Sequence, residues 1–332
     1  LLGKPVEGIR SHDMVPLLKE TNNFPMHRYI NKADITEELY EKIEFNLRDK
    51  CFADTTHGMP VDDDTNYMVL YQQIIEKYGR DFTSENVAEA WLKYQTIGSY
   101  FTAERIAFEN FVNGYVPPFS ALYKNPCREW IGAQIRGDYF GYINPGKPEE
   151  AAEMAFKDAC ISHVKNGIYG EMWVSAMIAA AGETDNINDI IHCGLSQIPY
   201  TSRLYKEITS IVNGFTNNVT DKECFSIIHE KYDEYTSHGW CHTIPNAMIV
   251  TAALLYGRGD FRKSVCMAVE TGFDTDCNGA TVGSILGMAN GISSIPESFT
   301  APLNDTLYTS IFGFDKLKIS DRIELTLKHI NE

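Results

Sequence analysis

Two acidic segments, far apart in the chain, carry the residues best suited to chemistry. The first is Asp62-Asp63-Asp64-Thr65, and the second is Asp274-Thr275-Asp276-Cys277-Asn278. Carboxylates packed this closely repel one another unless a cation neutralises them. Their oxygens suit hard ions such as Mg²⁺, Mn²⁺ or Ca²⁺, and two ions bridged by shared carboxylates suit this density. The two segments are therefore predicted to form one metal site.

A purely structural role is the alternative for each segment. Acidic residues are favoured at a helix N-terminus, so residues 62–64 could be a solvated cap. Asp274 and Asp276 are separated by one residue, which lets both side chains point to one side of an extended segment. Three interior glycines in the helix that follows cost about 3 kcal/mol, so another backbone is expected to pack closely on the face that carries them. The glycines of that face recur every four residues, at Gly279, Gly283, Gly287 and Gly291.

These motifs, in this order, resemble the ADP-ribosylglycohydrolase family, to which dinitrogenase reductase-activating glycohydrolase belongs. Gly272-Phe273-Asp274-Thr275-Asp276-Cys277-Asn278, followed by Gly283 and Gly287, resembles its G-G-D-T-D-T-N signature, and Asp62-Asp63-Asp64-Thr65 resembles its T-D-D-T motif. Leu1-Leu2-Gly3-Lys4-Pro5-Val6-Glu7-Gly8 resembles the end of the first helix and the acidic loop after it. Ile161-Ser162-His163 resembles the T/S-H pair in the middle of the fold. The resemblance runs from residue 1 to about Ile295.

The resemblance implies an all-α fold, a compact single-domain orthogonal helix bundle over residues 1–332. It implies a centre of two Mg²⁺ or Mn²⁺ ions, with Ca²⁺ as a possible substitute. The implied metal ligands are Asp62, Asp63, Asp64, Asp274, Asp276 and Cys277. The implied catalytic residues are Glu7, which acts as general base or positions a water molecule, and Asp63.

Three positions depart from the family's pattern. Asp62 stands where threonine is usual and would bind metal more strongly. Cys277 also stands where threonine is usual, and a thiol is a poor partner for Mg²⁺. Phe273 replaces the second glycine and is expected to narrow the pocket. The family's G-N-G-x-x-M-R segment is absent, and Arg136-Gly137-Asp138-Tyr139-Phe140-Gly141 occupies its neighbourhood.

The predicted substrate contacts come from the middle of the chain. Residues 137–148 form an irregular segment in which glycines allow close approach to a ligand and aromatic rings could stack on one. The alternative is an ordinary connection with its aromatics packed beneath it. A helix is predicted that begins at Pro148 and ends before Gly167, with an inward apolar stripe of Ala152, Ala155, Phe156, Ala159 and Cys160. His163 continues this stripe, and it is either a substrate contact or a hydrogen-bonded core residue. The predicted substrate-binding residues are Asp138, Tyr139, Gly141 and His163.

The favoured function is hydrolysis of a glycosidic bond at the anomeric carbon of ADP-ribose, on a modified protein or a small conjugate. On this hypothesis the acidic residues hold two cations that orient the ribose diol and activate water. One alternative is an inactive protein that binds ADP-ribose or has a structural role on the same fold. Another is a metal-dependent hydrolase of a different nucleoside or phosphoester. The sequence leaves open the linkage cleaved, the physiological target, the native metal and the oligomeric state.

Composition excludes several classes of partner. The 332 residues are 44% hydrophobic, which is enough for a buried core, and the formal charge is −16. This charge argues against a nucleic-acid groove and an anionic membrane surface, and no apolar run has spanning length. Eight cysteines without a C-x-x-C pair favour free thiols in a reducing cytoplasm. Cys241-His242 could supply half of a zinc site, but the sequence has no second pair at the spacing that zinc sites use, so a zinc site is not expected.

Helix signals dominate the chain, and sustained alternation is almost absent, so a sheet is not expected. One helix is predicted after Asp34, with Leu39, Ile43 and Leu47 on one face. A capping box at Thr220 and Glu223 predicts another. Further helices are predicted over residues 64–78, 84–98, 102–114, 245–256, 260–270, 278–291 and 321–329.

Overall fold

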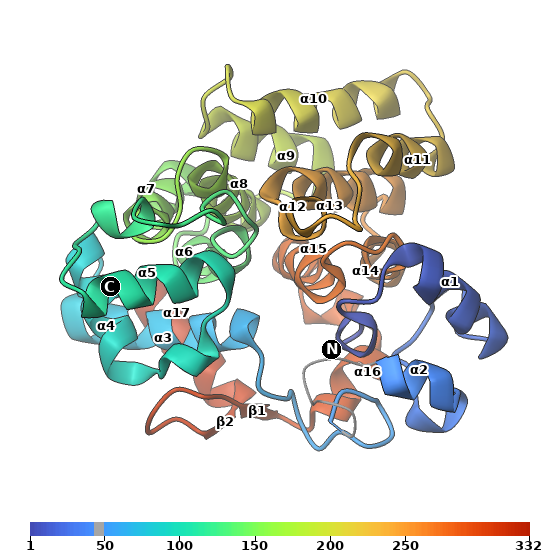
Figure 1. Ribbon diagram of the computed structural model, residues 1–332, viewed down its shortest axis with the longest axis horizontal. Coiled ribbons are helices and arrows are strands. Elements are labelled where there is room, and N and C mark those ends of the chain that lie inside the picture. The colour runs from blue at the N-terminus through green and yellow to red at the C-terminus, as the bar shows by residue number, and fades with distance from the viewer. Residues whose placement is uncertain (43–49) are drawn as a thin grey trace. The chain divides into compact units, whose positions relative to one another are not determined.

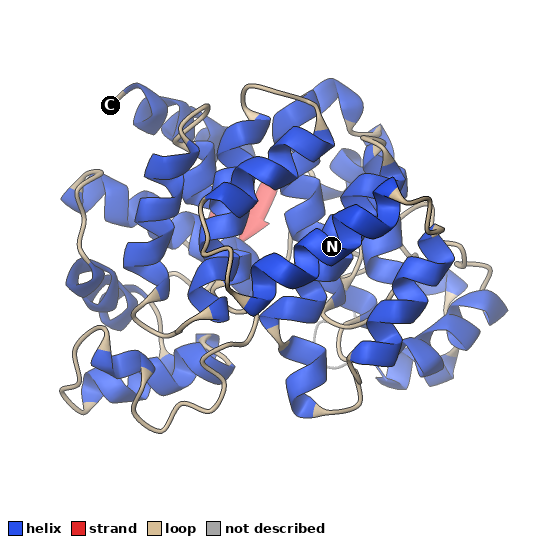
Figure 2. Ribbon diagram, turned by 90° about the horizontal axis from the view of Figure 1, so that it is seen from above, coloured by secondary structure: helices blue, strands red, loops and turns tan. Residues whose placement is uncertain are grey.

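The computed structural model describes residues 1–42 and 50–332, and its described part is mostly helical (Figures 1 and 2). The first helices are α1 (Ser11–Glu20), α2 (Glu37–Lys42), α3 (Asp63–Tyr78), α4 (Ser84–Tyr94), α5 (Thr102–Val112), α6 (Asp138–Tyr142), α7 (Pro148–Ala159), α8 (Asn166–Ala181) and α9 (Ile187–Ser196). The later ones are α10 (Arg203–Thr216), α11 (Asp221–Lys231), α12 (Ser237–Cys241), α13 (Thr243–Gly257), α14 (Phe261–Glu270), α15 (Thr275–Asn290), α16 (Glu297–Thr300) and α17 (Ile319–Asn331). Short strands β1 (Thr306–Tyr308) and β2 (Lys316–Lys318) pair with each other. The predicted all-α class is confirmed.

The chain folds into two compact units. Unit 1 comprises Leu1–Pro60, Glu207–Cys241 and Pro245–Leu307. Unit 2 comprises Val61–Lys206, His242–Ile244 and Tyr308–Glu332. The single domain expected over residues 1–332 stays a prediction.

Unit 2 is built around α8, which is apolar on all sides and buried along most of its length. Such a helix needs partners all round, and α6, α7 and α9 pack against it. Gly141 of α6 makes one close approach possible, because a Cβ there would lie 2.5 Å from the Cβ of Ile178. In the same unit α3 ends at Gly79, whose φ of +72° favours glycine.

Unit 1 places α14 against α15 and packs the N-terminal 3-10 turn η1 (Lys4–Val6) on the start of α15. The contact depends on Gly3, because a Cβ there would lie 2.4 Å from the carbonyl carbon of Thr275. The hydroxyl of Thr275 donates a hydrogen bond of 2.9 Å to the Gly3 carbonyl. This packing holds the residues after Gly3 beside the second acidic motif.

Several helix ends differ from the predicted ones. Helix α4 ends at Tyr94 rather than at Gly98, because Gln95 is already extended. Helix α15 begins at Thr275, so Asp276 lies in a helical turn and not in the extended segment expected for it. The predicted helix residues Ile43 and Leu47 lie outside the described residues. Among the described helices, none combines the length and apolar character needed to cross a membrane.

The helix that starts at Pro148 was predicted too long. Helix α7 ends at Ala159, so His163 lies in the turn before α8, and Gly167 belongs to the first turn of α8. The predicted inward stripe is wrong at Phe156, whose side chain is 48% exposed. The chain turns early because residues 160–163 are held by the core of unit 2, and periodicity does not report such contacts.

Glu270, the last residue of α14, gives unit 1 a pH-dependent stability. Its carboxylate accepts a hydrogen bond from the Met26 backbone, but burial dominates and raises the pKa of Glu270 to about 7. A carboxyl with a raised folded-state pKa contributes stability at low pH, and this stability is lost as the pH rises from about 4.5 to 7. Glu270→Gln cannot ionise and is expected to be more stable than wild type above pH 7 by about 2 kcal/mol, a figure that allows for partial solvent screening. Urea unfolding followed by circular dichroism from pH 4.5 to 8 measures this difference.

Glu153→Gln is the matched control, because the Glu153 side chain is 70% exposed. It should track wild type across the whole pH range. A Glu270→Gln advantage that is the same at pH 4.5 and pH 8 would show that the amide stabilises the protein by packing, and that burial of charge is not the cause.

Candidate metal site

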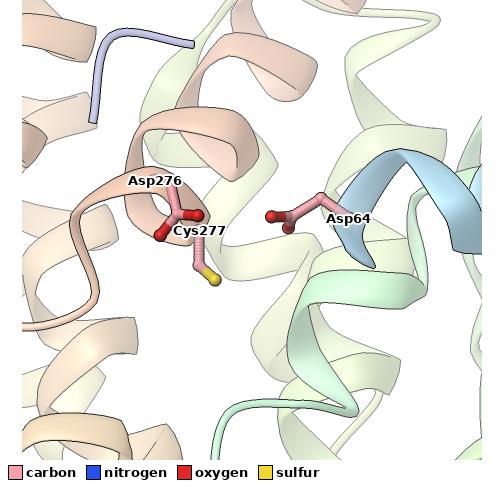
Figure 3. A group of neighbouring side chains, drawn as sticks. All are labelled: Asp64, Asp276 and Cys277. Carbon is pink, nitrogen blue, oxygen red and sulfur yellow. The ribbon is translucent and has the colours of Figure 1, made fainter. Parts of the chain in front are cut away.

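The second acidic motif lies at the start of α15, where Asp274 is the N-cap. Asp276 and Cys277 lie in the first turn (Figure 3 shows these two side chains). All three residues are buried. Asn246 of α13 organises this start. Its side-chain oxygen accepts hydrogen bonds from the Asp274 backbone at 3.1 Å and from the Asn278 amide at 2.8 Å. These bonds fix the direction in which the acidic turn leaves the loop.

Glu7, Asp274 and Asp276 form one carboxylate cluster within unit 1. Each offers an oxygen, and these oxygens lie within 4.8 Å of one another. Glu7 follows η1, so the packing of Gly3 on Thr275 brings it to the cluster. The structure thus joins the predicted catalytic glutamate to two predicted metal ligands.

Lys4 supplies a positive charge to this cluster. Its ammonium lies 2.6 Å from Oε2 of Glu7 and 2.8 Å from Oδ2 of Asp276. Burial opposes ionisation of Asp276, but the attraction and hydrogen bond from Lys4 outweigh it and lower the pKa of Asp276 to about 2. Asp276 is therefore a carboxylate at neutral pH.

The loop before α15 has an unusual backbone. Gly272 and Phe273 have φ values of +84° and +58°, and Phe273 is fully buried beside the ring of His229. Positive φ costs a non-glycine residue about 1–2 kcal/mol. Glycine would therefore suit position 273 better than phenylalanine does on backbone grounds alone. The carboxylate of Glu234 holds the turn by accepting hydrogen bonds from the backbone of Phe273 at 3.2 Å and of Ser11 at 2.8 Å. The expected narrowing of a pocket by Phe273 stays a prediction.

The glycine face of α15 is not covered as the spacing predicted. A Cβ at Gly279 would meet the Val269 side chain at 3.0 Å, and one at Gly283 would meet Phe261 at 3.7 Å. Side chains, not a second backbone, lie against these glycines, and a cavity of about 160 Å³ adjoins them and Asp276. The close backbone approach in this unit occurs instead at Gly3.

The first acidic motif forms the N-terminus of α3 in unit 2. Asp62 is the N-cap and accepts a hydrogen bond of 3.1 Å from the Asp64 backbone. Asp62 is buried, and Asp63 and Asp64 are half-buried in the first turn (Figure 3 shows Asp64). The three offer carboxylate oxygens within 4.8 Å of one another. A capping role is thus real for Asp62, while a single metal centre shared by both acidic motifs stays a prediction.

The predicted substrate residues of segment 137–148 lie on a short helix, α6, and not on an irregular loop. Asp138 begins it and is 9% exposed. Tyr139 is fully buried, and its hydroxyl lies 2.6 Å from Nδ1 of His329. Gly141 packs on Ile178. Packing of the aromatics beneath the connection is therefore the better description, and the substrate roles of these residues stay predictions.

His163 is a fully buried residue linked to a charged network. Nδ1 of its imidazole lies 2.8 Å from the Ser162 hydroxyl, which accepts a hydrogen bond of 2.8 Å from Arg136. Burial, reinforced by the Arg136 charge, lowers the pKa of His163 well below its usual value. The imidazole is therefore neutral, as expected for a core histidine.

Arg136 is the centre of that network and is itself fully buried. It pairs through Nε with Asp158, and its guanidinium lies 3.3 Å from Glu104 and 3.7 Å from Glu171. One guanidinium cannot neutralise three carboxylates. Accordingly, burial, followed by the charge of Asp158, raises the pKa of Glu171 well above its usual value, and burial also raises that of Glu104.

Three important residues escaped the sequence analysis, namely Lys4, Arg136 and Asn246. Lys4 and Arg136 each lie within a motif that was quoted for its neighbours, so their position was a usable signal. Asn246 carries no local signal, because it lies inside an otherwise apolar helical segment. Cys241, the cysteine of the Cys241-His242 pair, has a pKa raised well above its usual value by burial and then by the charge of Asp274, which favours an inert thiol. All eight cysteines lie in the described residues, and none of them forms a disulfide bond.

The sequence matches the ADP-ribosylglycohydrolase family over residues 1–326, so the chain belongs to that family. A solved structure described as "ADP-ribosylglycohydrolase-related protein complex" has the same fold, with a TM-score of 0.53 at 17% sequence identity. The similarity covers 81% of this chain and 79% of that one. Comparison with curated proteins finds no match.

Proposed function

We propose that this protein is a divalent-metal-dependent hydrolase that cleaves the glycosidic bond at the anomeric carbon of ADP-ribose, carried by a protein or a small conjugate. Membership of the ADP-ribosylglycohydrolase family supports the reaction class. The observation that carries the proposal is the carboxylate cluster of Glu7, Asp274 and Asp276 at the start of α15. A hydrolase of this kind needs such a cluster, whereas a helix start alone does not.

The donor atoms of this cluster fit Mg²⁺ or Mn²⁺. All are carboxylate oxygens, which hard divalent cations prefer. Oδ1 of Asp276 is buried and accepts no hydrogen bond from any residue in the described ranges, so a ligand atom is available. Cys277 fits less well, because its thiol suits softer metals than Mg²⁺. Asp62, Asp63 and Asp64 are proposed as the second set of ligands, supported by their own grouping of oxygens.

The chain's own residues have separable roles in this proposal. A bound divalent ion would supply charge stabilisation and a more acidic water molecule. Glu7, with 12% of its side chain exposed, accepts a proton from water or positions it. Burial of the cluster keeps bulk water away from the reacting atoms, which strengthens the electrostatic interactions there. Asp63 is proposed as a further catalytic carboxylate, and Asp138, Tyr139, Gly141 and His163 as residues that contact or support the substrate.

The net charge of the protein supports one class of target. With a net charge of −16, the protein suits a basic target such as an ADP-ribosylated arginine, whereas the pyrophosphate of ADP-ribose needs cations to offset the negative field. Eight cysteines without a disulfide bond support a reducing, cytoplasmic setting.

The direct test is release of ADP-ribose from arginine-linked, serine-linked and O-acetyl substrates. We expect release by the protein supplied with MgCl₂ or MnCl₂, and a rate at least about 100-fold lower after EDTA treatment, because several kcal/mol of transition-state stabilisation are lost with the ion. Chromatographic quantification of free ADP-ribose gives the rate. Absence of turnover on all three linkages, with either ion present, rules out the enzyme.

The second candidate is a protein that binds ADP-ribose without hydrolysing it, and Cys277 favours it. A buried thiol at a proposed ligand position weakens a Mg²⁺ centre. Calorimetric binding of ADP-ribose together with no turnover on any linkage would support this candidate. Restoration of turnover by Cys277→Thr would further assign the loss to the thiol.

A further inference from the structure

An ammonium group pairs with two members of the carboxylate cluster of unit 1, Glu7 and Asp276. Nζ of Lys4 forms an ion pair with Oε2 of Glu7 at 2.6 Å and donates a charge-assisted hydrogen bond of 2.8 Å to Oδ2 of Asp276. The side chains of Lys4 and Asp276 are 6% and 5% exposed, so water screens this contact weakly. The lysine therefore provides the cluster with a positive charge of its own.

The backbone fixes Lys4 in this place. Gly3 packs on Thr275 with no room for a side chain, and the Thr275 hydroxyl bonds to the Gly3 carbonyl at 2.9 Å. Pro5, the second residue of the turn η1, has a restrained φ, and Val6 is completely buried. The backbone of Lys4 is thus fixed on one side by Gly3 and on the other by Pro5 and Val6, which restricts the positions that its ammonium can reach.

We propose that Lys4 is an internal cation that competes with divalent ions for the cluster of Glu7, Asp274 and Asp276. The inference rests on the proposed function only in taking that cluster as a metal site. Three carboxylates with one ammonium carry a net charge of −2, whereas the carboxylates alone would carry −3. The cluster with Lys4 therefore attracts a divalent cation less strongly. An incoming ion also meets the repulsion of the ammonium, and it must share or displace the Lys4 contacts on Asp276 and Glu7.

The competition has two opposite consequences. Without divalent ions, Lys4 stabilises the folded protein because it offsets repulsion between the buried carboxylates. With divalent ions, it lowers their affinity, so the cluster fills only when the ion concentration is high enough to displace the ammonium. Lys4 thus sets the concentration range in which the site binds metal.

Titration calorimetry of the full chain with MnCl₂, after EDTA treatment and dialysis, tests the proposal. Lys4→Met keeps the apolar stem and removes the charge, and we expect it to bind Mn²⁺ at least about tenfold more tightly than wild type. The same variant should melt at a lower temperature than wild type in EDTA and show a larger upward shift when MnCl₂ is added. Lys4→Arg keeps the charge and should bind Mn²⁺ within about threefold of wild type. Lys222→Met, an exposed position on α11, controls for the change in net charge.

Equal or weaker Mn²⁺ binding by Lys4→Met overturns the proposal, as does the absence of Mn²⁺ binding in both proteins. Should Lys4→Met fail to fold, Lys4→Gln provides the same comparison with a neutral polar side chain. ADP-ribose release is measured separately on each variant. If Lys4→Met binds Mn²⁺ more tightly but no variant releases ADP-ribose, the competition by Lys4 is supported and only the hydrolase proposal is wrong. If ADP-ribose is released but the Mn²⁺ affinity of Lys4→Met is unchanged, only the proposed competition is wrong.

Discussion

Replacing Asp274 with asparagine is expected to abolish ADP-ribose release and to weaken Mn²⁺ binding at least about 100-fold. Asp274 offers one of three carboxylate oxygens that lie within 4.8 Å of one another. A neutral amide is a poorer ligand and removes one of the charges that attract the ion. The fold should survive, because removing a carboxylate also relieves repulsion in the unliganded cluster. Calorimetry with MnCl₂, the release assay and urea unfolding in EDTA measure the three effects.

Asp189→Asn provides the matched control for this change. Asp189 is an exposed residue in the first turn of α9 and belongs to neither acidic group. It should retain wild-type metal binding and release. If Asp274→Asn binds Mn²⁺ like wild type, Asp274 is not a ligand. If it loses several kcal/mol of stability in EDTA, the aspartate is a structural cap of α15.

Arg136→Met is expected to lower the free energy of unfolding by about 3–5 kcal/mol, the largest stability effect of any single change considered for this protein. Arg136 is fully buried and is the cation that Asp158, Glu104 and Glu171 face. Removing it leaves buried carboxylates without a counter-charge, and methionine restores volume but no hydrogen-bond donors. Urea unfolding followed by circular dichroism at pH 7 measures the loss.

The loss should shrink as the pH falls, because protonated carboxyls no longer need the guanidinium. The pKa values of Glu171 and Glu104 are raised chiefly by burial. These two carboxyls are therefore protonated first as the pH falls, and the destabilisation from their unpaired buried charges is removed first. Arg105→Met is the control, since its guanidinium is 55% exposed and pairs with Glu109 at 3.7 Å across one helical turn. It should cost less than about 0.5 kcal/mol. A similarly small cost for Arg136→Met would mean that the carboxyls around it are already protonated and that the ion pairs contribute little.

The family motifs could be identified from local sequence, and so could much of the helical framework. Each of these features depends on residues close together in the chain. The capping box of Thr220 and Glu223 forms as expected, and Gly79 ends α3 with a positive φ. The N-terminal position of Asp62, Asp63 and Asp64 on α3 follows from the same rules of helix capping.

Errors arose where distant residues decide a local outcome. Helix α7 stops at Ala159 because the following turn joins the buried core, although its apolar stripe continues in the sequence. The glycine face of α15 lies against side chains and a cavity, and the close backbone contact is made by Gly3. Tyr139 and Phe140 look suited to ligand stacking in the sequence, yet both are fully buried in unit 2.

The sequence by itself determined that the chain is helical, that it belongs to a family with two acidic motifs, and which carboxylates are candidates for metal. These properties depend on residue type, on spacing along the chain and on helix capping, all of which are local features of the sequence. Tertiary structure alone decided that Glu7 meets Asp274 and Asp276, that the Lys4 ammonium pairs with Glu7 and Asp276, and that Arg136 is buried among three acids. Such pairings depend on which helix faces pack together, and the energy of a buried charge depends on its neighbours in space rather than in sequence.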